Sequence, residues 1–220
     1  MRRVHWMGFA AWVALTATAA AQTVDIAARV SDEKGQPIAD AVVVAVPVDG
    51  LTRAAPRARE AIVDQVNKEF EPRVTAVLAG TAVIFPNHDD VRHHVYSFSP
   101  AKRFELPLYA GVPSHPVTFD RPGVVVLGCN IHDWMVGYVY VSESPYFAKT
   151  GKDGKAVLTE LASRVYIVRV WHPQLDGGEE ATRKSVDASR SRSVEVAWTL
   201  KLKPEIKIRR APSSDRGRRY

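Results

Sequence analysis

The sequence predicts an all-β protein built from two β-sandwiches. Its apolar residues fall mainly in short runs of about four to eight, a length typical of strands. Gly and Pro, which number 13 and 14 among the 220 residues, recur between these runs and indicate turns. Residues 194–202 alternate between apolar and polar side chains, as in a strand with one buried face.

The N-terminal segment 1–21 is expected to be a secretory signal peptide. It opens with Arg2 and Arg3, continues with an apolar stretch of mostly small side chains, and ends in the run Ala19–Ala21, which signal peptidase accepts. Cleavage is therefore expected near Gln22, with the mature chain periplasmic or secreted and no membrane span remaining. A retained anchor is the alternative, but the short apolar stretch ends in Ala rather than Leu or Ile, which favours removal.

The next elements are strands separated by turn residues. Apolar residues alternate between Val24 and Val30, segment 31–37 has turn composition, and Ala41–Val48 is a β-branched run. Residues 50–60 carry Gly, Pro and three Arg, and are expected to be a linker or domain boundary.

Residues 61–141 form a second block of short apolar strands. Many short strands with frequent turns are typical of a β-sandwich. Segment 59–70 has an alternative as an amphipathic helix, because Ile62, Val66 and Phe70 are spaced by four, but a strand is preferred. The strands expected in this block are Ala61–Asp64, Val74–Val77, Ala82–Phe85, Val95–Phe98, Val117–Phe119, Val124–Leu127 and Val136–Val141.

A third stretch begins after Pro145. It contains two expected strands, Ala156–Leu161 and Tyr166–Trp171, before the alternating segment 194–202. The intervening residues, Asp176–Ser193, are polar and are expected to form a loop.

The formal net charge of +6 does not indicate nucleic-acid binding. Residues 201–220 contain eight Lys or Arg and two acids, so they carry the whole +6, and removal of Arg2 and Arg3 leaves the rest of the mature chain at −2. The basic tail, residues 204–220, is expected to be a solvated, disordered end, with contact to an anionic surface or partner as the alternative.

The single cysteine lies in a segment that predicts a metal site. Cys129, His132 and Met135 stand at intervals of three, and His93 lies upstream, just before an expected strand. Two imidazoles, one thiolate and a weak axial thioether are the ligands of an electron-transfer copper site. A buried Cys beside unrelated His and Met residues is the alternative.

Residues 61–141 resemble the cupredoxins, the blue copper proteins with a Greek-key β-sandwich. The resemblance rests on segments 67–72 (Asn-Lys-Glu-Phe-Glu-Pro) and 80–87 (Gly-Thr-Ala-Val-Ile-Phe-Pro-Asn), on His93, and on Pro122-Gly123 leading into Cys129. The Cys-x2-His-x2-Met spacing resembles the short ligand loop of amicyanin rather than that of plastocyanin. The resemblance implies one mononuclear copper ion held by His93, Cys129, His132 and Met135.

The same resemblance implies supporting roles for neighbouring residues. Asn87 would brace the ligand loops, and the backbone amide of His94 would donate to the Cys129 sulfur. His94 also competes with His93 as the first ligand, although adjacent strand residues point to opposite faces, so that only one of the two can face the metal. Electrons are expected to pass through the exposed edge of His132, with Trp134 and Met135 forming an apolar docking patch.

The flanks of this block resemble a different sandwich. Val24–Val48, with the sequence Gly-Gln-Pro-Ile-Ala-Asp-Ala at 35–41, and Lys149–Pro173, with Asp-Gly-Lys at 153–155 and Tyr-Ile-Val at 166–168, resemble the first hairpin and the later strands of a carboxypeptidase-regulatory-like β-sandwich. The resemblance implies that segments 22–56 and 145–203 form this sandwich and that the copper domain, residues 57–144, is inserted into it. The whole arrangement also resembles exported proteins labelled methylamine utilisation proteins. Glycan binding by this flanking sandwich has no aromatic platform to support it.

The expected function is to carry single electrons between redox partners of the dehydrogenase or cytochrome type. The alternatives are a copper-binding or delivery protein, and a carbohydrate- or protein-binding module with a structural metal. An enzyme is not expected, because multicopper oxidases and nitrite reductases need further His clusters and this chain has seven His in total. Outside the expected signal peptide, the remaining histidines are His88, His115 and His172, which are expected to be loop or structural residues. A second metal site at His88, beside Asp89 and Asp90, is the alternative.

Overall fold

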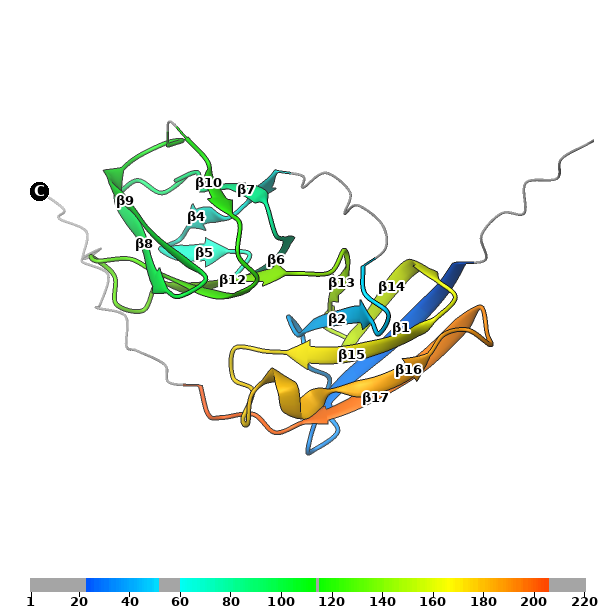
Figure 1. Ribbon diagram of the computed structural model, residues 1–220. Helices are drawn as coiled ribbons and strands as arrows, with labels where there is room; N and C mark the ends of the chain where they lie inside the picture. Colours follow the sequence, from blue (N-terminus) through cyan, green and yellow to red (C-terminus); the bar gives the residue numbers. More distant parts are fainter. Residues whose placement is uncertain (1–22, 52–59, 114, 206–220) are drawn as a thin grey trace, which may run out of the picture.

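The computed structural model describes residues 23–51, 60–113 and 115–205. The expected signal peptide, most of the expected linker and nearly all of the basic tail lie outside these residues. Among the described residues, no helix has both the length and the apolar character that a membrane span requires. The strands form two groups that lie side by side (Figure 1).

The two ends of the described chain together form the first sandwich. One of its sheets has the order β14-β1-β17, and β1 pairs antiparallel with β14 and parallel with β17. The other sheet has the order β13-β2-β15-β16 and is antiparallel throughout. The strands are β1 (Thr23–Asp32), β2 (Val42–Pro47), β13 (Tyr146–Lys149), β14 (Lys155–Ala162), β15 (Val165–Trp171), β16 (Lys184–Asp187) and β17 (Ser193–Leu200).

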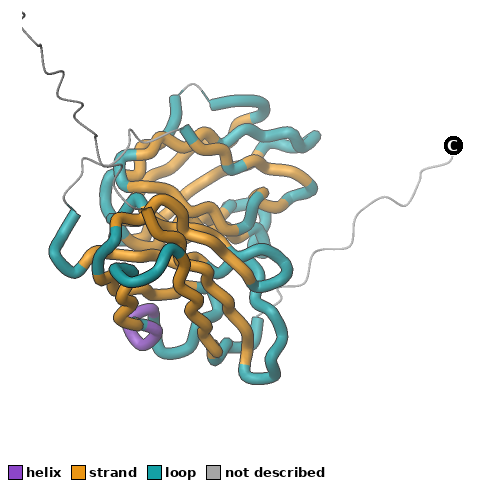
Figure 2. Tube along the Cα trace, turned by 90° about the vertical axis from the view of Figure 1, so that its right-hand side faces the viewer, coloured by secondary structure: helices purple, strands orange, loops and turns teal. Residues whose placement is uncertain are grey.

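The middle of the chain forms the second sandwich. A five-stranded sheet, β6-β12-β11-β8-β9, faces the smaller sheet β10-β7-β3 and the hairpin β4-β5. The strands are β3 (Ala61–Ile62), β4 (Asp64–Val66), β5 (Glu69–Glu71), β6 (Val74–Leu78), β7 (Thr81–Ile84), β8 (His93–Ser99), β9 (Lys102–Tyr109), β10 (Val117–Phe119), β11 (Gly123–Gly128) and β12 (Val136–Ser142). Figure 2 shows the dominance of strands in both groups. The all-β fold class with two sandwiches is confirmed.

Each sandwich has its own apolar core. In the first, Ile26, Tyr166 and Trp198 are among the buried residues between the two sheets. In the second, Phe85, Phe119 and Leu127 are fully buried, and Cys129 and Met135 belong to the same cluster. The candidate metal ligands therefore lie at the edge of a close-packed core, which limits their side-chain freedom.

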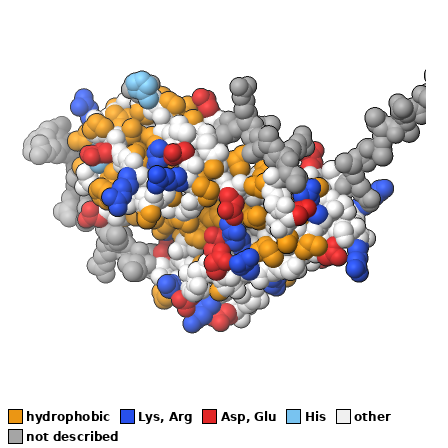
Figure 3. All heavy atoms as spheres, in the orientation of Figure 1, with side chains coloured by type: hydrophobic (Ala, Val, Ile, Leu, Met, Phe, Trp, Pro, Cys, Tyr) orange, Lys and Arg blue, Asp and Glu red, His pale blue; other side chains and the backbone are white. Residues whose placement is uncertain are grey.

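A third apolar cluster joins the two sandwiches. Val42 and Val44 of β2 pack against Val74 of β6 and Tyr140 of β12, while the alternate β2 residue Val43 belongs to the first core. Because β2 is buried on both faces, its sequence is an unbroken apolar run rather than an alternating one. In the space-filling view, hydrophobic side chains lie where the sandwiches meet, with acidic and basic side chains grouped beside them (Figure 3).

Three expectations about single elements require correction. The expected loop Asp176–Ser193 contains a 3-10 helix, η1 (Glu179–Thr182), and strand β16. Thr182 explains part of this order, because its hydroxyl donates to the Val170 carbonyl and accepts from the Val170 amide. Strands β9 and β13 were not expected. Neither contains a fully buried residue, so neither has a strong apolar pattern, and β9 also contains Pro107. The preference for strands within segment 59–70 is confirmed for the described residues, which form β3, β4 and most of β5.

Beside the apolar cluster, hydrogen bonds to a half-buried carboxylate also join the two sandwiches. The buried Tyr140 hydroxyl donates to the Glu179 carboxylate at 2.5 Å, and Arg169 donates to the same carboxylate at 2.6 Å. Tyr140→Phe is expected to lower the free energy of unfolding by about 1.5–3 kcal/mol in urea denaturation, because a hydrogen bond to a charged group is lost. Tyr138→Phe is the matched control on the same strand face and should change it by less than about 0.5 kcal/mol; equal losses would contradict this role for Glu179.

Candidate metal centre

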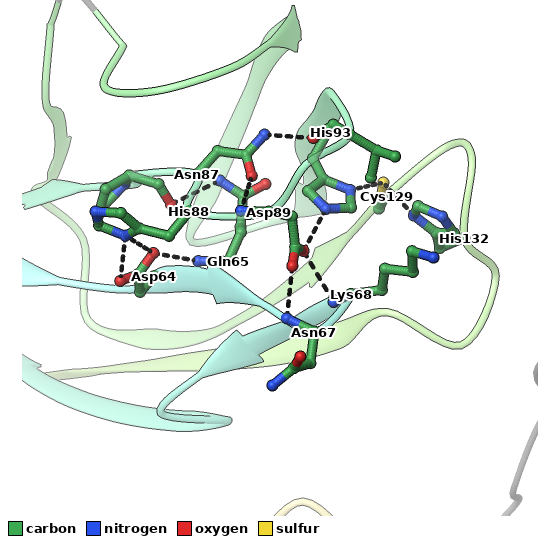
Figure 4. Close-up of polar contacts among 12 residues, drawn as sticks. Asp64, Gln65, Asn67, Lys68, Asn87, His88, Asp89, His93, Cys129 and His132 are labelled. Atoms are coloured by element: carbon green, nitrogen blue, oxygen red, sulfur yellow. Dashed lines mark hydrogen bonds and ion pairs between the residues drawn. The ribbon is translucent and has the colours of Figure 1, made fainter. Parts of the chain in front are cut away.

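Three of the four expected ligands converge at one end of the second sandwich. His93 begins β8, Cys129 directly follows β11, and His132 lies in the short loop that leads into β12. The Cys129 sulfur lies 3.8 Å from His93 Nδ1 and 4.0 Å from His132 Nδ1, so both rings present the same nitrogen to it (Figure 4). The three donor atoms all lie within 4.8 Å of one another, and they form the one group of this kind found among the described residues.

These distances suit a single transition-metal ion. Metal–nitrogen bonds of about 2.0 Å and metal–sulfur bonds of about 2.3 Å at tetrahedral to trigonal angles separate N from S by about 3.5–3.7 Å. The two N–S separations, 3.8 and 4.0 Å, are slightly above that range. One soft thiolate with two imidazoles is also the donor set that copper prefers in electron-transfer sites.

Met135 closes the loop on the buried side. Its amide donates to the His132 carbonyl at 2.9 Å, which makes residues 132–135 a turn that ends at the start of β12. Its side chain is 1% exposed and belongs to the same apolar cluster as Cys129. A thioether held in this core is available as a weak fourth donor.

Asp89 holds His93 in place, a role that was not predicted from the sequence. Its carboxylate accepts from His93 Nε2 at 2.7 Å, and from the amides of Asn67 and Lys68 at 2.6 and 2.8 Å. A proton on Nε2 leaves Nδ1 of His93 as the bare nitrogen that faces Cys129. This carboxylate–imidazole pair therefore selects the tautomer that a metal ligand needs.

The turn that supplies these two amides is built for them. Asn67 and Lys68 are the two residues between β4 and β5, and their φ angles are 54° and 60°. Two consecutive left-handed residues are the conformation of a type I′ hairpin turn, which Asn favours. Burial alone would raise the pKa of Asp89, but the hydrogen bonds from Lys68, His93 and Asn67 lower it below its usual value. The pattern Val-Asn-Lys-Glu was the available sequence signal for this turn.

Asn87 makes three side-chain hydrogen bonds in and around the loop that precedes His93, while its expected role in bracing the ligand loops stays a prediction. Its side-chain amide donates to the carbonyls of Val91 and Tyr109, both at 2.9 Å, and its side-chain oxygen accepts from the Asp89 amide at 3.0 Å. These hydrogen bonds tie the loop that carries Asp89 to Val91, just before β8, and to Tyr109 of β9, which is paired with His93.

His94 points away from the cluster, as alternation along β8 requires. Its Nε2 lies 2.8 Å from the Glu105 carboxylate, and its buried Nδ1 has no hydrogen-bond partner among the described residues. The structure therefore brings His93, and not His94, to Cys129. The expected hydrogen bond from the His94 amide to the Cys129 sulfur stays a prediction.

The rings of the two expected electron-entry residues, His132 and Trp134, are neighbours, and His132 also neighbours the ring of His93. The His132 ring lies 5.0 Å from the His93 ring and 5.0 Å from the Trp134 ring, measured between centroids. His132 is half-buried, and the neighbouring Ile131 is 48% exposed. The loop therefore presents apolar surface to the outside at Ile131, whereas Met135, which was expected in the docking patch, is 1% exposed and lies in the core instead.

The other loop histidine, His88, lies apart from the cluster. Its Nδ1 contacts both carboxylate oxygens of Asp64, at 2.7 and 2.8 Å, and its side chain is 66% exposed. This geometry matches an exposed loop residue with an acidic neighbour.

Lys68 sets the charge at the outer edge of the cluster, and it supports a second prediction. Figure 4 shows its ammonium end beside the His132 ring. Burial lowers the pKa of His132 below 6.5, and the charges of His93 and Lys68 lower it further, against an opposing effect of Asp89. In the metal-free chain, Lys68→Met should raise the His132 pKa in an NMR titration of the ring protons.

The sign of the linked stability follows from the same shift. His132 binds its proton more weakly in the folded chain than in the unfolded chain, where the pKa is about 6.5. Its protonation therefore favours unfolding, and stability falls as the pH drops below that value and through the folded pKa. Lys102→Met is the control, because Lys102 pairs with Asp120 and lies at the opposite end of the β8–β9 hairpin from His93. An equal shift from both variants would contradict a local effect of Lys68.

The fold and this cluster define an all-β protein with a candidate mononuclear metal site. No protein-family model and no curated protein matches the chain. Among solved structures, it is similar to a copper-containing nitrite reductase from Thermus scotoductus SA-01, with 28% identity and a TM-score of 0.37 over 44% of this chain and 25% of that one. The match thus spans a quarter of the nitrite reductase.

Two smaller solved proteins are similar over their whole length. A purple cupredoxin from Nitrosopumilus maritimus has 26% identity and a TM-score of 0.33, with 38% of this chain and 99% of that one covered. A variant of amicyanin has 18% identity and a TM-score of 0.35, with 47% and 99% covered. Because all three TM-scores are below 0.5, the function of this chain is inferred from the residues of the cluster itself.

Proposed function

We propose that this chain is an exported type 1 copper protein that carries single electrons between redox partners. The observation that supports it best is the convergence of His93 Nδ1, His132 Nδ1 and the Cys129 sulfur within 4.8 Å. We assign these residues and Met135 as the ligands of one copper ion, which would supply a one-electron couple when bound. The periplasmic or secreted location rests on the expected signal peptide.

The chain's own residues provide what fast electron exchange needs. His93 is fixed by Asp89, Cys129 and Met135 are held in the second core, and residues 132–135 form a closed turn. A rigid donor set changes little between two oxidation states, which keeps reorganisation small. His132 and Trp134 provide the route to the surface, and a dehydrogenase or cytochrome that docks there is the proposed partner.

The domain organisation is part of the proposal. We assign residues 57–144, which include the second sandwich, to the copper domain, and residues 22–56 with 145–203 to the first sandwich. Each has its own buried cluster, and the joining cluster around β2 and β12 supports a fixed contact between them. The resemblance of the first sandwich to carboxypeptidase-regulatory-like domains stays a prediction.

The proposal is tested by adding Cu(II) to the chain expressed from residue 22. An intense visible absorption that disappears on reduction and returns on oxidation is expected, with one copper per chain by elemental analysis. Copper binding with no such absorption would favour a delivery protein or a structural metal instead. Zinc bound in preference to copper would overturn the electron-carrier proposal.

Met135 supports a third prediction, on the reduction potential. Met135→Leu should keep the visible absorption and raise the potential, because a weak donor that stabilises the oxidised ion is removed. Redox titration of the copper-loaded chain measures this effect. The other two methionines, Met1 and Met7, lie in the expected signal peptide and cannot serve as controls. Val139→Leu, which changes another side chain of the same core, is therefore the control for altered packing. Loss of copper binding in Met135→Leu would mean that the axial assignment is wrong.

A further inference from the structure

The outer face of the five-stranded sheet is apolar over β6, β12 and β11 and as far as Phe98 of β8, but it is only partly covered. Over β6 and β12 it is covered by the first sandwich, which buries Val74 and Tyr140. Further along the same face, Val126 of β11 is 43% exposed and Phe98 of β8 is 74% exposed. The apolar surface therefore continues beyond the contact between the two sandwiches.

The strand registers place these residues in one row across the sheet. Tyr138 is paired with Val74 on one side and with Val126 on the other. Gly128 is paired with Tyr96, and the same antiparallel register, two residues further on, sets Val126 opposite Phe98. Because neighbouring strands lie about 4.8 Å apart, Phe98 is about 10 Å from Tyr138 along this row.

The described chain ends beside this row. After β17, the Lys203 amide donates to the Gln174 carbonyl of the first sandwich at 2.7 Å. Two residues later, the Glu205 carboxylate contacts the Arg73 guanidinium at 2.5 Å, and that guanidinium lies 5.9 Å from the centre of the Tyr138 ring. The chain has therefore left the first sandwich by Glu205 and has reached the edge of the exposed apolar surface.

We propose that segment 206–210 of the C-terminal tail covers this surface, with Ile206 and Ile208 on Val126 and Phe98. The three residues that follow Glu205 span about 10 Å in extended form. This is the distance from Tyr138 to Phe98, so Ile208 can reach Phe98. The segment reads Ile-Lys-Ile-Arg-Arg, so in extended form its two isoleucines share one face and Lys207 points the other way.

One further observation favours this occupant. The segment would extend a contact that already exists, because the same sheet face carries the first sandwich on β6 and β12. On the neighbouring strand β9, Arg103 is paired with Phe98 and Glu105 with Tyr96, so the charges there are mixed and the apolar row selects the occupant. The proposal does not depend on copper.

Limited trypsin digestion of the full mature chain tests the proposal with an internal reference. Cleavage after Lys207 and Arg209 is compared with cleavage after Arg216 in the same tail, first in the unchanged chain and then in Phe98→Ser. The substitution should speed cleavage at the first two sites at least about tenfold relative to Arg216, because cleavage follows the population of the undocked segment. Phe98 is largely exposed, so the variant is expected to fold.

Two sets of variants serve as controls for the digestion. Val157→Ser, at a 53% exposed valine on the first sandwich, should leave the ratio of cleavage rates unchanged. Ile206→Ser combined with Ile208→Ser should reproduce the effect of Phe98→Ser. Equal relative cleavage in the unchanged chain and in Phe98→Ser overturns the proposal, as does protection that rises with protein concentration, which a second copy of the chain on this face would cause.

Discussion

Cys129→Ser is expected to abolish the intense visible absorption of the copper-loaded chain. The absorption depends on charge transfer from a thiolate to copper, and Cys129 is the single cysteine of the sequence. A serine hydroxyl is a hard donor that does not suit both oxidation states of copper, so copper binding should weaken as well. Visible spectroscopy and a competition titration with a chelator measure the two effects.

The control for this substitution is another metal-binding side chain outside the cluster. His88→Ala removes an exposed imidazole that contacts Asp64 and should leave the absorption unchanged. A Cys129→Ser chain that keeps the band, or a His88→Ala chain that loses it, would show that the centre lies elsewhere.

The fold was predictable where one face or both faces of a strand are buried. The unbroken apolar run of β2 and the alternation of β17 both reflect burial, in the first case by a sheet on each side. Strand β9 was missed because its residues face either solvent or the rim of the core, so that its ladder with β8 leaves little apolar pattern. Strand β16 was missed because only one of its four residues, Val186, is buried.

The candidate site was predictable to the extent that one short loop contains it. Cys129, His132 and Met135 lie within seven residues, and alternation along β8 allowed only one of His93 and His94 to join them. Asp89 could not be assigned in the same way. Its role depends on a hairpin turn more than twenty residues away in sequence, whose two amides reach it only in the folded chain.

Strand β12 connects the candidate centre to the first sandwich. It begins directly after Met135, packs Val139 and Val141 into the core of the second sandwich, and turns Tyr138 and Tyr140 towards the first. The rings of Tyr138 and Tyr140 lie 5.9 and 5.5 Å from the ring of Trp171. The first sandwich therefore supports β12, the strand at which the ligand loop ends. This contact gives the first sandwich a structural role that needs no partner.

Asp89→Asn is expected to weaken binding of the oxidised copper ion and to raise the reduction potential. The carboxylate lends negative charge to the His93 ring through a 2.7 Å hydrogen bond, and that charge favours the more highly charged Cu(II). Loss of such a partner typically costs about 10- to 100-fold in metal affinity. If the loss falls on the oxidised ion, the one-electron potential rises by about 60–120 mV.

Two further variants separate charge from geometry at this position. An asparagine oxygen can still accept from His93 Nε2, so Asp89→Asn should keep the ring orientation, whereas Asp89→Leu should lose both the charge and the orientation and bind copper more weakly still. Asp90→Asn, at the exposed neighbouring acid, is the control and should leave the potential almost unchanged, because exposed charges are screened. A rise of equal size in Asp89→Asn and Asp90→Asn would attribute the effect to net charge rather than to the hydrogen bond on His93.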